Sequence, residues 1–247
     1  MVLLEVCASS VTSAIAAQTG GASRVELCDN LNYGGTTTSF GQILLARKML
    51  HIKLYALIRP RSGDFLYSDL EFETMMADIR NCIEAGCDGI VTGILNADGT
   101  VDKERNGELV RTAKQWGLGA TFHRAFDMCV DQYRALEDII DLGFERILTS
   151  GGKSTAMEGA SVISHLVEKA AGRISIMAGA GINEHNAADL VRYTGVKEIH
   201  ASARLKIESL MKYKNDHIVM GDTLNDEYSF HQTDVERVKK ILKLINK

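Results

Sequence analysis

Short apolar and β-branched runs alternate along the whole chain with longer segments in which apolar residues recur every three or four positions. The short runs predict strands and the longer ones predict amphipathic helices. A helix that starts near Asp69, for example, places Phe72, Met75 and Ile79 on one face. The pattern predicts strands at Val2–Cys7, Arg24–Cys28, Lys53–Arg59, Gly89–Thr92, Gly119–His123, Arg146–Ser150, Ile174–Ala178 and Glu198–Ala201.

The alternation of strands and helices predicts a single α/β domain over residues 1–247, a (β/α)8 TIM barrel. An open doubly wound sheet is the alternative, but no glycine-rich dinucleotide fingerprint opens the first helix. Glycines follow several helices, where a left-handed residue lets the chain turn into the next strand. These are Gly86, Gly117, Gly143 and Gly195. Residues 203–233 lack clear periodicity and predict a long irregular arm or lid.

Composition narrows the class of partner. The formal net charge is -4, which offers no basic surface for nucleic acid, so we expect a small-molecule partner. No apolar run reaches the roughly 18 residues that span a membrane. The first residues are interrupted by Glu5 and do not resemble an export signal. The 5 cysteines are odd in number and scattered, which indicates reduced thiols, and we expect a cytoplasmic protein.

Ionisable and thiol side chains alternate with apolar ones along the predicted strands. Side chains of one parity point into a barrel, and the carboxyl ends of its strands carry the active site. Two interpretations remain open, because the same charges would also form an ion-pair network that only fills the interior. The inward set includes Glu5, Cys7, Arg24, Glu26, Cys28, Arg59, Arg61, His123, Met177 and His200.

Candidate catalytic residues lie at the ends of three predicted strands. Glu5 or Glu26 is a candidate base, and His123 is a candidate acid. Asp127 follows His123 closely and is a candidate for holding the tautomer of its ring. The alternative is that Asp127 caps the next helix and His123 is a satisfied residue of the rim.

Candidate anion-binding residues lie on the same rim. Arg59 and Arg61 flank Pro60, which fixes the backbone between two guanidinium groups that suit a carboxylate or phosphate. Their alternative role is pairing with Glu5, Glu26 or Asp64. Glycine-rich turns after the sixth and seventh strands can bring backbone N–H groups to a phosphate. The other candidates are Arg124, Ser150, Gly151, Gly179, Gly181, His200 and Ser202.

Soft ligands also point into the predicted interior. Cys7 and Cys28, with Met177, provide the sulfur ligands that Cu(I) prefers, so Cu(I) is a candidate cofactor. No CxxC pair is present, and isolated buried cysteines are more often small apolar residues than ligands.

At these residues the chain resembles the CutC family over essentially its full length. The resemblance implies a cytoplasmic barrel that forms a homo-oligomer and handles copper, with no specific reaction attached. Two positions depart from the family pattern: Thr38 stands where the family usually has proline, and Ala8 stands where some relatives have a second cysteine. The matching runs are Leu4–Cys7, Arg24–Cys28, Ile58–Phe65, Thr121–Asp127, Leu148–Gly151, Met177–Gly181, Met211–Asn215 and Asp226–Tyr228.

Two functions therefore remain as hypotheses. The first is copper homeostasis with Cu(I) bound by the inward thiols, as the family resemblance implies. The second is an enzyme of unknown reaction that acts on a small anionic molecule, such as a phosphorylated one, at the carboxyl rim. The arginines favour an anion, because their charge repels a metal ion.

Overall fold

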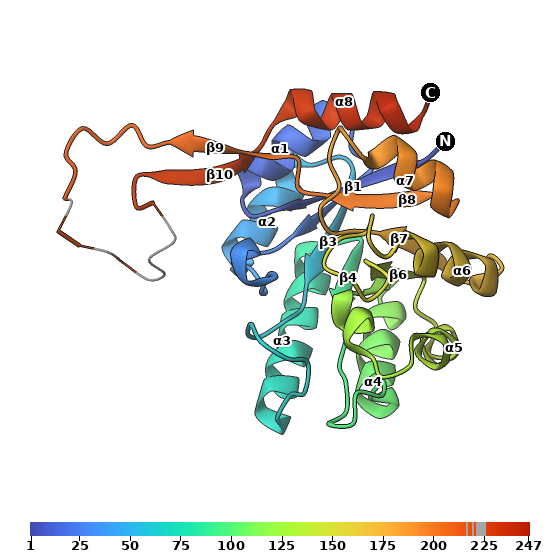
Figure 1. Cartoon of the computed structure of the whole chain (residues 1–247). Helices are drawn as coiled ribbons and strands as arrows, with labels where there is room; N and C mark the ends of the chain where they lie inside the picture. The colour runs from blue at the N-terminus through green and yellow to red at the C-terminus, as the bar shows by residue number, and fades with distance from the viewer. Residues whose placement is uncertain (216, 219, 221–225) are drawn as a thin grey trace.

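The computed structural model describes the whole chain except residues 216, 219 and 221–225, which belong to the predicted arm. In the described part, eight parallel strands form a closed barrel in sequence order, with helices around the outside (Figure 1). This confirms the predicted (β/α)8 class. The barrel strands are β1 (Leu3–Ala8), β2 (Arg24–Leu27), β3 (Lys53–Leu57), β4 (Gly89–Thr92), β5 (Gly119–Phe122), β6 (Arg146–Thr149), β7 (Ser175–Ala178) and β8 (Glu198–Ala201).

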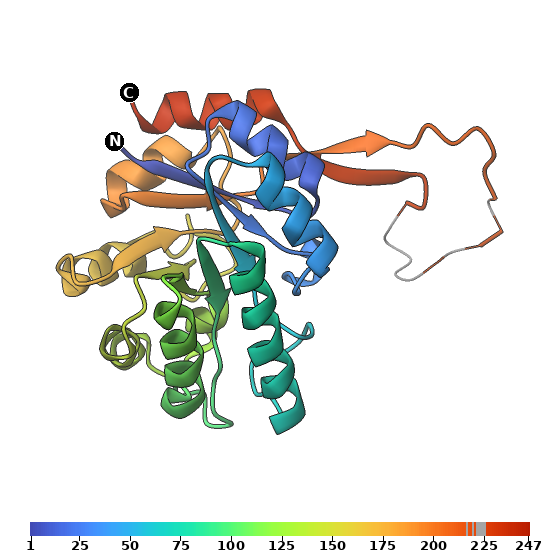
Figure 2. The ribbon, with the colours of Figure 1, turned by 180° about the vertical axis from the view of Figure 1, so that it is seen from behind.

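The helices lie around the outside of the strands, as seen from both sides in Figures 1 and 2. Their apolar side chains pack with those of the strands in one core. The capping box of Ser68 and Glu71 starts α3, which begins at Asp69 as its periodicity predicts. Gly86 closes the same helix with a φ of 76°, a conformation that favours glycine. The helices are α1 (Val11–Gly20), α2 (Phe40–Met49), α3 (Asp69–Ala85), α4 (Lys103–Gln115), α5 (Gln132–Leu142), α6 (Ala160–Ala170), α7 (Ala187–Thr194) and α8 (Val235–Ile245), with 3-10 turns η1 (Leu31–Tyr33) and η2 (Arg124–Met128).

The strand register decides which polar side chains become neighbours inside the barrel. Cys7 of β1 lies opposite Glu26 of β2, and Glu5 of β1 lies opposite His200 of β8. Because β1 pairs with both β2 and β8, closure brings residues from the two ends of the sequence onto one wall. The first wall of the candidate site is therefore built by β8, β1 and β2.

The segment after β8 leaves the barrel as an arm. Its two ends pair as antiparallel strands, β9 (Arg204–Glu208) and β10 (Ser229–Thr233). Both views show this hairpin projecting to one side of the barrel (Figures 1 and 2). The chain then returns into α8, where Asn246 bonds to both the N–H and the carbonyl of Val2. The C-terminal helix thereby holds the start of β1.

Candidate functional site

A cavity of about 370 Å³ opens at the carboxyl ends of the barrel strands. This volume fits a small molecule. Nine of the residues predicted from the sequence line it together, and they come from strands and loops around the whole rim. They are Cys7, Glu26, Cys28, Arg59, His123, Arg124, Gly181, His200 and Ser202.

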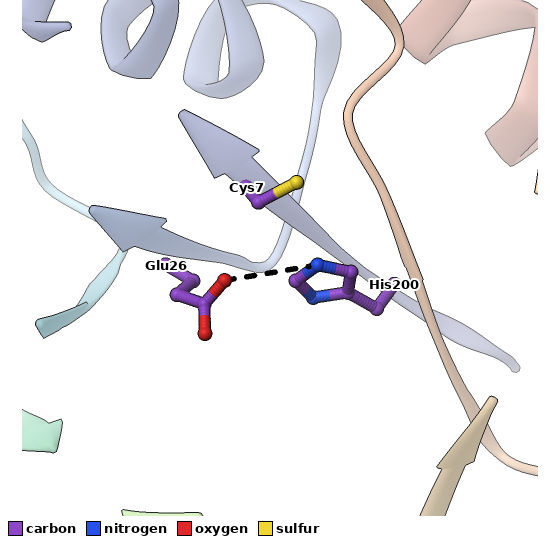
Figure 3. Close-up of side chains that lie close together, drawn as sticks. All are labelled: Cys7, Glu26 and His200. Carbon is purple, nitrogen blue, oxygen red and sulfur yellow. Dashed lines mark ion pairs between the residues drawn. The ribbon is translucent and has the colours of Figure 1, made fainter. Parts of the chain in front are cut away.

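Three buried side chains on one wall form a group that can hold a metal ion. One ligand atom each from Cys7, Glu26 and His200 lies within 4.8 Å of the other two (Figure 3). The His200 Nε2 atom is 3.7 Å from Glu26 Oε2, while Nδ1 is 2.7 Å from Glu5 Oε1. A carboxylate on one ring nitrogen, with the other nitrogen facing further ligands, is how proteins orient a histidine for metal binding.

The charges of this wall depend on one another. Burial opposes protonation of His200, but Cys7, Glu5 and Glu26 together hold its pKa well above the ordinary 6.5. Burial also works against an ionised Glu5, yet the charge of Arg24 and the contact with His200 lower its pKa to about 2. Burial raises the pKa of Glu26 to about 7 against the attraction of His200. The wall therefore favours a proton on His200, which a metal ion bound to Nε2 would have to displace.

An ion-pair network fills the barrel below this group. Arg24 pairs with Glu5 and Glu198, and Arg146 Nε bonds to Glu198 at 2.7 Å. Both guanidinium groups lie against the ring of Tyr55, at 5.3 and 5.8 Å from its centre. The ion-pair network that was the alternative interpretation of these charges is thus present beneath the cavity. Arg146 and Glu198 were not among the predicted site residues, although the alternation of side chains along their strands places both inside the barrel.

The opposite wall carries a histidine with an unused donor. His123 Nδ1 accepts a hydrogen bond from the Ala125 N–H at 3.2 Å, which leaves the proton on Nε2. Nε2 has no hydrogen-bond partner among the described residues. Burial, and then the charge of Arg59, lower the pKa of His123 to about 3, so its ring is neutral. The structure therefore makes His123, which lines the cavity, a buried hydrogen-bond donor without an acceptor among the described residues.

Arg61 differs from its expected position beside Arg59. Its guanidinium lies outside the cavity and pairs with Glu71 at 2.6 Å and with Asp64 at 2.9 Å. Arg59 is instead buried and faces the cavity. Pro60 therefore separates the two arginines, and the expectation that both reach one ligand is corrected. Of the alternative partners named for them, Asp64 is the one that Arg61 contacts.

Asp127 also has a different role from the one expected. Its carboxylate accepts hydrogen bonds from the Thr149 hydroxyl at 2.5 Å and from the N–H groups of Ser150 and Gly152 at 3.0 Å. It also pairs with Arg124 at 2.8 Å. The residue that contacts His123 Nδ1 is Ala125, and the N-cap of α5 is Asp131. Asp127 therefore organises the loop after β6.

The predicted glycines divide into two kinds. A Cβ on Gly151 would lie 2.5 Å from the Gly159 carbonyl oxygen, and one on Gly179 would lie 2.5 Å from the Leu148 side chain. Close packing against backbone requires glycine at position 151, whereas the end of the Leu148 side chain could move aside for a Cβ at position 179. Ser150 is buried and donates its hydroxyl to the Lys153 carbonyl at 2.5 Å. Gly181 and Ser202 line the cavity as expected.

The sulfur groups expected beside Cys7 are held less favourably for a metal ion. Burial, and then the negative charge of Glu26, raise the pKa of the Cys28 thiol well above its usual value, which disfavours a thiolate. The sulfur of Met177 accepts a contact from the Arg24 guanidinium at 3.5 Å. A cation already occupies the neighbourhood of that thioether, so the structure groups Cys7 with His200 and Glu26 instead.

Fold and site together define a (β/α)8-barrel protein with a cavity at its carboxyl rim and, on one wall of that cavity, three side chains that could hold a metal ion. The family model described as CutC family matches residues 2–205. A CutC family protein of Chromobacterium violaceum is 46% identical over 245 residues, which cover 99% of this chain and 98% of the relative. The chain belongs to the CutC family.

Two further comparisons agree with this assignment. The human copper homeostasis protein cutC homolog is 47% identical over 240 residues, covering 97% of this chain and 87% of that protein. The crystal structure of the putative copper homeostasis protein CutC from Streptococcus agalactiae matches with a TM-score of 0.78 at 39% identity, over 82% of this chain and 99% of that one. Within the described residues, no helix is both long and apolar enough to cross a membrane.

Proposed function

We propose that this chain is a copper homeostasis protein that binds copper through Cys7, His200 and Glu26. The observation that carries the proposal is the convergence of their ligand atoms within 4.8 Å on one buried wall. The names of the human and streptococcal relatives support the same role.

Two of the three donors, the Cys7 thiol and the His200 imidazole, fit copper chemically. Thiolate selects Cu(I), and imidazole suits copper in both common oxidation states. Glu5 fixes the His200 ring through Nδ1, so Nε2 is the nitrogen that faces the other two ligands. Arginines repel a metal ion, but Arg61 pairs with Asp64 and Glu71 outside the cavity, and the charge of Arg24 is balanced by Glu5 and Glu198. Arg59 is the arginine of the original pair that still lines the cavity.

A reducing compartment suits this chemistry. All five cysteines are free, and Cys7 is available as a ligand only while it is reduced. We therefore place the protein in the cytoplasm, where thiols are kept reduced. The homo-oligomer implied by the family resemblance remains a prediction, to be checked by light scattering.

Competition titration of Cu(I) against a colorimetric chelator, under reducing conditions, tests the proposal. We expect Cys7→Ser to weaken binding by at least about 100-fold, since a hydroxyl is a poor ligand for Cu(I). His200→Gln should weaken it by a similar factor. Cys28→Ser should have a smaller effect, because the buried thiol is held protonated.

Cys129→Ser is the matched control. Cys129 directly follows η2, and its sulfur contacts the Ala125 carbonyl rather than the proposed copper ligands. Wild-type affinity in the Cys7→Ser variant, or in the Cys7 and Cys28 double variant, would remove the thiols from the proposed copper site. An equal loss in Cys129→Ser would show that the assay reports nonspecific thiol binding.

A further inference from the structure

Arg59 is a buried cation without an acidic partner. Its guanidinium donates to three main-chain carbonyls, those of Tyr33 at 3.2 Å, Gly35 at 2.7 Å and Gly63 at 2.8 Å. The residue is 4% exposed, and no carboxylate in the described part of the chain lies within 4.0 Å of its charged nitrogens. These carbonyls satisfy the terminal N–H groups, but Nε has no hydrogen-bond partner among the described residues. The positive charge also stays uncompensated, which is costly in a buried position.

His123 presents a second unused group on the same side of the cavity. The residue is 5% exposed, and its Nε2–H finds no acceptor among the described residues. A buried donor without an acceptor destabilises the folded protein. Its ring is neutral, so it offers one fixed hydrogen bond rather than a positive charge.

Phe65 fixes the two groups relative to each other. The Arg59 guanidinium carbon lies 4.9 Å from the centre of the Phe65 ring, and the His123 ring lies 4.9 Å from the same ring. All three side chains line the cavity. One rigid aromatic platform thus holds an uncompensated positive charge and an unused hydrogen-bond donor at one cavity wall.

We propose that this wall is a binding site for a small organic oxyanion, a carboxylate or a phosphate ester, which accepts a hydrogen bond from His123 Nε2 and balances the charge of Arg59. The ligand would satisfy both unmet requirements at once. This goes beyond copper binding, because β5 stands opposite β1 in a closed barrel of eight strands and the metal-ligand group lies on the β1 side. The site therefore adds an organic ligand to a cavity that also faces the copper ligands.

Calorimetric titration of the metal-free full chain at low salt tests the site. Inorganic phosphate, glycerol 3-phosphate and lactate are the anionic probes, and glycerol is the neutral control. We expect at least one anion to bind and glycerol to give no signal. Preference for phosphate esters or for lactate would distinguish a phosphoryl from a carboxylate ligand. Absence of binding by every anion at millimolar concentration would overturn the proposal.

His123→Phe is the decisive variant, because it keeps a ring against Phe65 and removes the N–H donor. It should weaken binding of the preferred anion at least about tenfold, as expected for one hydrogen bond to a charged group. Arg61→Met is the matched control and should bind like the wild type, since Arg61 already pairs with Asp64 and Glu71. Unchanged anion binding in His123→Phe, or an equal loss in Arg61→Met, would contradict the assignment.

Arg59→Met should weaken anion binding still further, but Arg59 also joins the loops that follow β2 and β3 and its loss can unfold the rim. His123→Phe therefore decides the matter if Arg59→Met does not fold. The same His123→Phe protein should bind Cu(I) with wild-type affinity, so the anion site and the copper site can succeed or fail separately.

Discussion

The floor and the rim of the barrel treat buried charge in opposite ways. On the floor, Arg24 and Arg146 share Glu198, and Arg24 also holds Glu5. On the rim, the described partners of the Arg59 charge are carbonyl dipoles and the Phe65 ring, with no carboxylate among them, and His123 keeps an unused N–H. Both regions are buried, so solvent exposure does not explain the difference.

The contrast separates structural charges from functional ones. A buried charge that is fully paired has a structural role, because removing its partner leaves an uncompensated buried ion that destabilises the fold. A buried polar group that lacks a partner destabilises the empty protein, and a ligand can offset that cost. We therefore interpret the floor as the support for the proposed copper ligands and the rim as the proposed site for an additional molecule.

The largest expected effect is on the floor. Arg24→Met removes the cation that compensates Glu5 and Glu198, and should lower the free energy of unfolding by about 3–5 kcal/mol. Denaturant unfolding followed by circular dichroism measures this loss. A loss below about 1 kcal/mol would mean that the floor network is not the structural element described here.

The free energy of unfolding should depend on pH through His123 at the rim. The pKa of His123 falls from 6.5 to about 3 on folding, so the unfolded chain takes up a proton that the folded chain refuses between these values. The contribution of His123 to the free energy of unfolding is therefore complete above pH 6.5. It is lost as the pH falls toward 3, by up to about 1.4 kcal/mol per pH unit.

Other groups also titrate in acid, so the comparison is between wild type and His123→Phe. The variant should show a shallower decline of unfolding free energy between pH 6.5 and pH 3. Parallel curves for the two proteins would show that His123 is not held neutral in the folded state.

The smallest effect is expected at the rim's outer edge. Arg61 pairs with Asp64 and Glu71, but its side chain is 38% exposed, so solvent screens these pairs. Arg61→Met should change the free energy of unfolding by less than about 1 kcal/mol, as measured by denaturant unfolding. A larger loss would place Arg61 among the structural charges with Arg24.

Alternation along the strands was enough to predict much of this arrangement. The predicted strands agree with the observed ones to within two residues at each end, and parity placed Glu5, Cys7 and Glu26 inside the barrel. Alternation says which way a side chain points but not which strand stands beside it. Barrel closure places β8 next to β1, and this is what joins His200 to Cys7 and Glu26 in one group.

The remaining site residues depended on loop conformation, which follows no period. Arg59 and Arg61 are two positions apart, yet they separate after Pro60 because the chain has left the strand. Asp127 contacts the loop after β6 rather than His123, because η2 turns it away from the ring. The free donor of His123 could not be predicted at all, since it depends on the Ala125 N–H occupying the other ring nitrogen.

The most direct test of the copper assignment is an anomalous difference map, recorded at the copper absorption edge, from crystals grown with Cu(I) under reducing conditions. The account predicts one dominant peak between Cys7 Sγ and His200 Nε2, with Glu26 beside it. A dominant peak elsewhere in the protein, or no peak in fully loaded crystals, would contradict the account.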